Sequence, residues 1–161
     1  MSEQHADKVI ELTLPADVEF IGIARLLMSG VANRMGFAYD EIEDIKLAVA
    51  EACTNSVRHA YEGGQTGTFT ITSTLHEDRL VVQVSDKGKS FDASQIKMAP
   101  LDPTKELEEL TEGGLGLYLI HTLMDQVEIR SDDGILIEMV KYVQRDEVAY
   151  VDNESSQTRT E

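Results

Sequence analysis

The chain has 161 residues, the length of a single domain, and its 42% hydrophobic content is sufficient for a core even without tryptophan. Its formal net charge of −16 argues against nucleic acid or anionic lipid as a partner, because both would be repelled at long range. The same charge favours a basic protein partner and repels free ATP, so a nucleotide would have to bind together with a cation.

The sequence carries no signal for export or membrane insertion. Cys53 is the single cysteine and stands among apolar neighbours, which predicts a core residue rather than a nucleophile. Residues 1–8 are polar and lack the hydrophobic segment of a signal peptide. The longest apolar run, around residues 115–124, is too short and too polar to span a bilayer. These features together predict a reducing compartment, the cytoplasm.

The first predicted elements are a strand and a helix. Residues 8–14 alternate weakly in polarity before Pro15 and predict the strand. Asp17 is expected to cap a helix that continues to about Met35 and ends at Gly36. The side chains expected to face the core are Val18, Ile21, Leu27 or Met28, Val31 and Met35.

A second amphipathic helix is predicted from residue 42 to residue 61. Asp40 with Glu43 three residues later resembles a capping box at its start. Gly63-Gly64 is expected to close it.

The middle of the chain predicts two strands, residues 68–75 and 79–85, joined by a short polar turn. Residues 87–112 follow without clear periodicity and contain two prolines. A loop of this length within one domain is typical of a lid over a binding site or of disorder.

The last elements are a helix over residues 117–124 and a hairpin of strands 127–130 and 135–143. Asp133-Gly134 between these strands is typical of a type I′ turn. From about residue 150 the tail is polar and is expected to be disordered.

The order of elements predicts an α+β fold, a two-layer sandwich of one mostly antiparallel sheet with helices on a single face. The other sheet face must then be polar or covered. Thr70, Thr72 and Thr74 alternate along one strand and suggest that this face is partly exposed.

Three stretches are candidates for chemistry, and the first is a polar stripe on the second helix. Glu51, Asn55 and His59 stand at i, i+4 and i+8, so they share one helix face. A neutral amide oxygen such as that of Asn55 suits Mg²⁺, which takes few protein ligands and binds phosphate oxygens well. Glu51, one turn earlier, suits a general base. The alternatives are an ordinary solvated helix face and, for His59, a hydrogen-bonded structural histidine.

The second stretch is Asp86-Lys87-Gly88, which directly follows a predicted strand. A carboxylate held at a strand end is suited to accept a hydrogen bond from the exocyclic amino group of adenine. Gly88 would let the backbone approach a flat ring. The alternative is a simple strand-ending turn, in which Asp and Gly are common.

The third stretch contains three glycines, Gly113, Gly114 and Gly116, ahead of the predicted last helix. Exposed backbone amides at a helix start form an anion site, although the helix dipole contributes only about 0.3–1 kcal/mol at an exposed position. Micromolar affinity requires about 8 kcal/mol, so a metal ion and burial of the base must supply most of it. The alternative is a flexible hinge.

These stretches, in this order, resemble the GHKL (Bergerat) nucleotide-binding fold of gyrase, chaperone, histidine-kinase and MutL ATPases. Glu51 and Asn55 match its N box, and Asp86 and Gly88 match its first glycine box. Gly113, Gly114 and Gly116 match its second glycine box. The resemblance covers about residues 8–143 and implies an ATP-binding kinase domain there. Ser90 stands where many members have a further glycine, and no adenine contact is assigned to the last hairpin.

Within that superfamily the chain is similar to the anti-sigma serine-protein kinases of Gram-positive bacteria, most closely in YDEIEDIKLAVAEACTN and EGGLGLYLIHTLMD. The resemblance implies two competing partners. One is an alternative, stress-response sigma factor that is held inactive. The other is a small anti-anti-sigma protein (the RsbV type) that is phosphorylated on a serine. It also implies ATP and Mg²⁺ as cofactors and a homodimer as the assembly.

The resemblance assigns a role to each candidate residue. Asp86 would fix adenine, Asn55 would bind Mg²⁺, and the 113–116 amides would hold the phosphates under the 87–112 lid. Glu51 would orient or deprotonate the attacking serine. The main alternative is a nucleotide-gated binding module without phosphotransfer. A histidine-kinase fragment is less favoured, because no room for a phosphoacceptor helix pair precedes residue 17.

Overall fold

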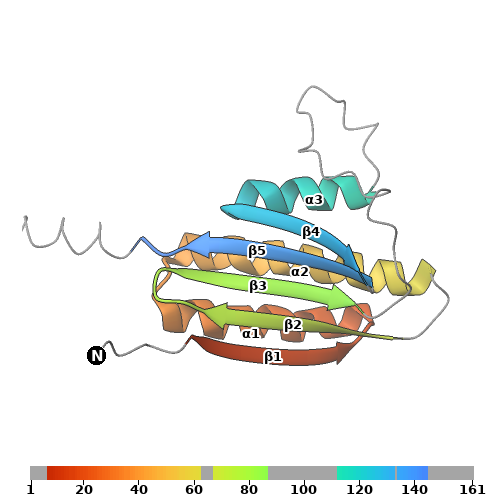
Figure 1. The fold of residues 1–161 in the computed structure, drawn as a ribbon, viewed down its shortest axis with the longest axis horizontal. Coiled ribbons are helices and arrows are strands. Elements are labelled where there is room, and N and C mark those ends of the chain that lie inside the picture. Colours follow the sequence, from red (N-terminus) through yellow and green to blue (C-terminus); the bar gives the residue numbers. More distant parts are fainter. Residues whose placement is uncertain (1–6, 63–66, 87–111, 133, 145–161) are drawn as a thin grey trace, which may run out of the picture.

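The computed structural model describes residues 7–62, 67–86, 112–132 and 134–144. The described strands form one five-stranded sheet, and in Figure 1 they lie side by side with the helices behind them and along one edge. In chain order the elements are β1 (Lys8–Pro15), the 3₁₀ turn η1 (Val18–Phe20), α1 (Ile21–Met35), α2 (Tyr39–Glu62), β2 (Thr68–Leu75), β3 (Arg79–Asp86), α3 (Glu112–Leu123), β4 (Gln126–Asp132) and β5 (Gly134–Tyr142).

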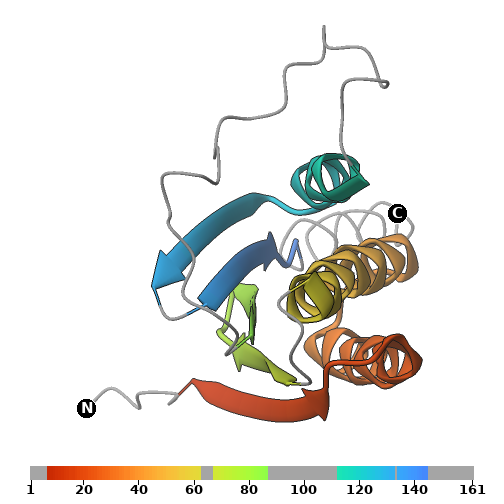
Figure 2. The same ribbon diagram turned by 90° about the vertical axis from the view of Figure 1, so that its right-hand side faces the viewer.

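The sheet has the strand order β1-β2-β3-β5-β4, and every neighbouring pair is antiparallel. Figure 2 shows all three helices on one face of this sheet. The predicted α+β two-layer sandwich is therefore confirmed. Thr70, Thr72 and Thr74 lie on the other face and are half-buried, as their alternation with Phe69 and Ile71 predicts.

The core lies between the helices and the sheet and is largely aliphatic. Met28, Met35 and Met124 are buried in it, as is Cys53, so these residues have the structural role that the sequence predicts. Strand β3 alternates regularly, with Leu80, Val82, Val84 and Asp86 facing inward.

The start of α1 differs from the prediction. Asp17 does act as a cap, and its Oδ1 accepts a hydrogen bond from the Glu19 N–H at 3.2 Å, but it caps η1 rather than an α-helix. Val18, predicted to face inward, is 62% exposed because the 3₁₀ turn does not continue the phase of α1. Gly36 ends α1 in the left-handed conformation with φ 90°, as predicted.

Helix α2 starts three residues earlier than predicted, and the Asp40–Glu43 capping box is wrong. Glu41 instead accepts a hydrogen bond from the Ala38 N–H at 3.1 Å, which is the backbone half of a capping box with alanine at the cap position. Glu43 pairs with Lys46 at 3.0 Å. The predicted stop at Gly63-Gly64 lies outside the described residues.

Helix α3 also starts earlier than predicted, at Glu112 rather than at residue 117. All three glycines of the 113–116 stretch therefore lie within the helix. In the last hairpin, Gly134 has φ 113° and Asp133 lies outside the described residues. Outside them too are Gly88, nearly all of the predicted lid and the predicted disordered tail.

Candidate functional site

The polar stripe of α2 lies at the edge of the core. Glu51, Asn55 and His59 are all half-buried, whereas Ala52 and Ser56 on the other side of the helix are buried. The structure thus confirms that the stripe is not a fully solvated helix face.

Helix α3 packs directly against this stripe. A Cβ atom built on Gly116 would lie 3.0 Å from Glu51 Oε2 and 3.9 Å from Asn55 Nδ2. In Figure 2 the two helices lie next to each other on the same face of the sheet. Two stretches that are far apart in sequence therefore meet, and Gly116 allows the close approach because it has no side chain.

The position of Gly116 changes the role expected for it. It is the fifth residue of α3, and the N–H of a fifth helical residue is used within the helix. Gly113 and Gly114 lie in the first turn, where backbone N–H groups have no partner within the helix and suit an anion. The expected amide contact therefore fits Gly113 and Gly114, whereas Gly116 fits a packing position under the Glu51 carboxylate.

Asp86 is the last residue of β3, and its side chain is only 1% exposed. His59 Nδ1 lies 3.4 Å from Asp86 Oδ2, so the stripe of α2 reaches the end of the sheet. The two readings of His59 that the sequence leaves open both remain, because a contact with buried Asp86 fits a structural histidine as well as a residue of the site.

Gly134 is a member of this site that sequence reasoning missed. A Cβ atom on it would overlap the Asp86 carbonyl oxygen and would lie 3.1 Å from Asp86 Oδ1. The positive φ of Gly134 excludes most other residues as well. Asp133-Gly134 predicts a turn from the sequence, but a turn signal does not predict that Gly134 packs against Asp86.

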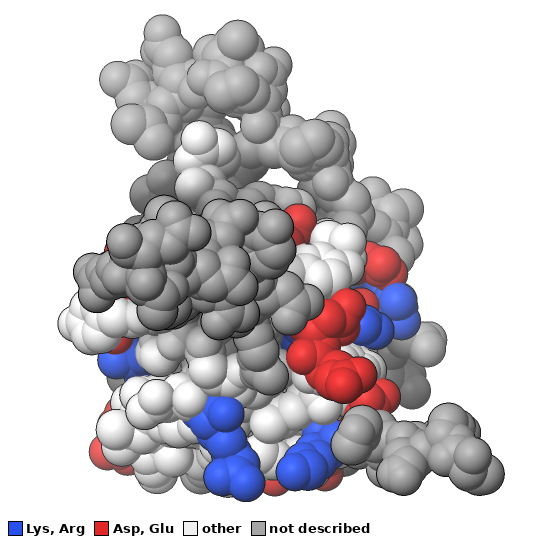
Figure 3. All heavy atoms as spheres, turned by 90° about the vertical axis from the view of Figure 1, so that its left-hand side faces the viewer, with Lys and Arg blue, Asp and Glu red and all other residues white. Residues whose placement is uncertain are grey.

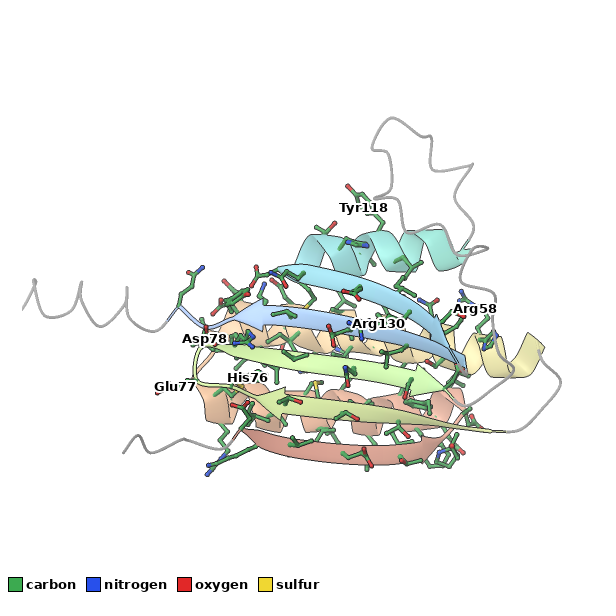
Figure 4. All side chains as sticks on the ribbon, in the orientation of Figure 1. Arg58, His76, Glu77, Asp78, Tyr118 and Arg130 are labelled. Atoms are coloured by element: carbon green, nitrogen blue, oxygen red, sulfur yellow. The ribbon has the colours of Figure 1, made fainter. Side chains whose placement is uncertain are left out.

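Arg58 is a cation on the same helix that sequence reasoning did not consider. It stands seven residues after Glu51, two helical turns along nearly the same line, and it is half-buried. Figure 4 shows it towards the end of α2, at the end of the molecule where β3 finishes. A cation at this position is notable in a chain with a net charge of −16.

The opposite end of the molecule carries a separate pocket of about 300 Å³, lined in part by Lys8, Arg34 and Glu77. His76 and Asp7 also line it, and His76 Nδ1 lies 2.9 Å from Asp7 Oδ2. Figure 3 shows that both acidic and basic side chains reach the surface at this end. None of the predicted site residues lines this pocket, so it is distinct from the site at Asp86.

Cys53 is on α2 but does not belong to the site. It is fully buried, and burial raises the pKa of its thiol to about 12. A neutral, inaccessible thiol is neither a nucleophile nor a metal ligand.

The donor chemistry of the site is carboxylate and amide oxygen. No cluster of three or more His, Cys, Asp or Glu that could hold a metal occurs in the part of the chain that the structure describes. Mg²⁺ does not need such a cluster when phosphate oxygens and water complete its octahedron. The amide oxygen of Asn55 therefore fits a magnesium ion that arrives with a nucleotide. Among the described helices, none is both long and apolar enough to cross a bilayer.

Comparison with known proteins shows the family to which the chain belongs. Residues 14–141 match the family described as "Histidine kinase-like ATPase domain". A protein of Halalkalibacterium halodurans named "Serine-protein kinase RsbW" is 50% identical over 159 residues, which cover 98% of this chain and 97% of that protein. The chain belongs to the RsbW family of serine-protein kinases.

Other RsbW proteins show the same degree of similarity. One from Bacillus cereus is 53% identical over 141 residues, covering 86% of this chain and 88% of that protein. One from Bacillus mycoides is 52% identical over 141 residues, with the same coverage. The resemblance inferred from the three stretches is thus confirmed at the level of the RsbW family and its ATPase domain.

Proposed function

We propose that this RsbW-family protein is an anti-sigma factor and a protein serine kinase. It sequesters an alternative, stress-response sigma factor and uses Mg-ATP to phosphorylate a serine on its anti-anti-sigma antagonist. The observation that carries the proposal is the convergence at α2, where Gly116 packs on Glu51 and Asn55 while His59 contacts Asp86. One helix therefore joins the groups expected at the phosphates to the group expected at the base.

Asp86 is the residue proposed to recognise adenine. Its buried carboxylate stands at a strand end and can accept a hydrogen bond from an exocyclic amino group. Burial strengthens such a bond, because competing water is absent. Gly88, two residues on, is proposed to leave space for the ring.

The phosphates are proposed to lie between the start of α3 and the middle of α2. First-turn amides at Gly113 and Gly114 would bind phosphate oxygens, and Asn55 would hold Mg²⁺, which neutralises phosphate charge when bound. Arg58, on the same stripe, adds a positive charge. These groups offset the repulsion between a triphosphate and a chain of net charge −16. Residues 87–112 are proposed to cover the bound nucleotide, within a kinase domain spanning 8–143.

Glu51 is proposed as the catalytic residue. It orients the serine hydroxyl of the partner and accepts its proton as the oxygen bonds to the γ-phosphorus. The bond from that phosphorus to the bridging oxygen breaks, and ADP leaves with the electron pair. Phosphoryl transfer depends mainly on positioning and charge neutralisation, which suits a carboxylate that lies beside Gly116 at the start of α3.

The overall charge supports a switch between the two partners. A phosphoserine adds about −1.5 to −2 charges, which weakens docking against so acidic a kinase. Release of the phosphorylated antagonist leaves the kinase free to bind the sigma factor. The assembly is proposed to be a homodimer in the cytoplasm, where a sigma factor acts.

The test is a phosphotransfer assay with Mg²⁺, labelled ATP and candidate anti-anti-sigma proteins. Glu51→Gln should lower the rate by roughly 10²–10⁴-fold while ADP and partner affinities remain. Glu43→Gln, on the same helix but paired with Lys46, is the matched control and should be neutral. Full partner binding without any phosphotransfer by the wild type would favour the alternative, a nucleotide-gated binding module.

A further inference from the structure

His59 lies between the residues proposed to act at the phosphates and the residue proposed to bind the base. It is one helical turn beyond Asn55 and two beyond Glu51, yet its imidazole reaches Asp86 at the end of β3. The Nδ1–Oδ2 distance is 3.4 Å, and the two side chains are only 12% and 1% exposed. At that depth little water is available to orient a carboxylate, so protein groups must orient it.

Gly134 restricts the same carboxylate from the other side. The position of a Cβ on Gly134 is 3.1 Å from Asp86 Oδ1, so the backbone of the β4–β5 hairpin lies against that oxygen. Asp86 is therefore held between α2 and β5, with a different oxygen facing each element. Rotation of the carboxylate about its last bond would disturb both contacts.

We propose that His59 is a positioning residue for base selection, which directs the Asp86 carboxylate towards the amino group of an adenine nucleotide. With Nδ1 protonated, the imidazole donates towards Asp86 Oδ2 and fixes the plane of the carboxylate. A separation of 3.4 Å is longer than the usual range of about 2.7–3.2 Å, and such contacts often shorten once a ligand is bound. The inference rests on the proposed function, which assigns the base to Asp86.

If His59 fixes the Asp86 carboxylate, the site should distinguish adenine from guanine nucleotides. Adenine presents an amino group at position 6, whereas guanine presents a carbonyl oxygen there. A carboxylate with a fixed plane accepts a hydrogen bond from the first and repels the second, whereas a mobile one can turn aside. His59 should therefore affect the ratio of ADP to GDP affinity much more than it affects binding of the phosphates.

The experiment measures binding of ADP, GDP and tripolyphosphate by calorimetry in magnesium buffer. His59→Leu should lower the ADP-to-GDP affinity ratio by roughly tenfold and leave tripolyphosphate binding unchanged. His59→Asn should restore the ratio, because its amide nitrogen takes the place of Nδ1, whereas His59→Gln places the amide further out and should not. His76→Leu is the matched control, because His76 also pairs through Nδ1 with an aspartate, at the opposite end of the molecule.

Each outcome is decisive. An unchanged ratio in His59→Leu, or equal losses of ADP and tripolyphosphate affinity, would overturn the inference. If His59→Leu does not fold by circular dichroism, the Asn and Gln variants decide, and equal ratios in those two would also overturn it. A wild-type protein that binds ADP no better than GDP would instead remove the proposed function.

Discussion

The Glu51 carboxylate and the backbone of Gly116 lie so close together that a single methyl group on residue 116 would approach Glu51 Oε2 to 3.0 Å. This oxygen is at the end of a flexible side chain, so Glu51 can move aside and the fold can accommodate the methyl group. The position of the Glu51 carboxylate, the proposed base, would then change.

Gly116→Ala should therefore separate activity from stability. We expect phosphotransfer to fall by about 10²-fold, because the carboxylate is displaced from its working position. Stability should not fall, since alanine favours a helix over glycine by roughly 0.5–1 kcal/mol. Single-turnover phosphotransfer and urea unfolding measure the two effects. Gly30→Ala on α1 is the matched control, because its Cβ would meet no atom within 4 Å, and an equal loss of activity in it would refute this account.

Gly134→Ala, unlike Gly116→Ala, should lower both the stability of the fold and the affinity for nucleotide. Its φ of 113° and its overlap with the Asp86 carbonyl leave no space for a side chain, and the expected cost is about 1–3 kcal/mol. Urea unfolding and ADP titration are the measurements. Gly67→Ala, also next to a strand but in open space, should change stability by no more than about 0.5 kcal/mol. Comparable losses in the two variants would contradict the contact with Asp86.

Cys53 should make stability depend on alkaline pH. Its folded pKa is raised to about 12 by burial, above the value of about 8.5 for an exposed thiol. The protonated thiol is present in both states below the unfolded pKa, so its contribution is constant there. Above it the unfolded chain gains by ionising, and the contribution is lost as pH rises towards 12.

The measurement compares urea unfolding of the wild type and of Cys53→Ala at increasing pH. The other titrating groups are common to both proteins, so the difference isolates the thiol. It should narrow with rising pH, and the native thiol should resist alkylating reagents until the chain unfolds. A constant difference, or rapid labelling of the folded protein, would show that the thiol is not shielded.

Binding of the sigma factor should weaken as salt is added. A chain of net charge −16 attracts a basic partner mainly through long-range charge interactions, which salt screens. Association rates measured at several salt concentrations should fall more steeply than dissociation rates rise. An affinity that is the same at low and high salt would exclude charge as the basis of partner choice.

The elements that the sequence predicted well are those whose signals are local. The β2–β3 hairpin follows from alternating residues around a polar turn, and the end of α1 follows from Gly36 in the left-handed conformation. The start of α2 was missed because alanine stands at the cap position, where no side-chain signal exists. The start of α3 was missed because glycine disfavours a helix, and the packing of Gly116 against α2 has no signal in the local sequence.

The site shows the same division between local and distant information. Helical spacing predicted that Glu51, Asn55 and His59 share one face, which is a local property. The contact of His59 with Asp86, and that of Gly134 with the same residue, depend on how α2 and β5 meet at the end of β3. Spacing along the chain does not predict contacts between elements that are distant in sequence. The contacts of His59 and Gly134 with the Asp86 carboxylate are therefore visible only in the structure.

Asp86 faces the core, as do Leu80, Val82 and Val84 at the alternate positions before it in β3. Turning Asp86 to the other face of the sheet would require the whole strand to shift by one residue. Such a shift would also expose those three apolar side chains to water. The register of β3 thus fixes the face of the sheet on which the Asp86 side chain lies, whereas the plane of its carboxylate depends on the contacts of that side chain. We therefore expect control over nucleotide occupancy to act on entry and exit, since the Asp86 side chain cannot move to the other face of the sheet without a shift of the whole strand.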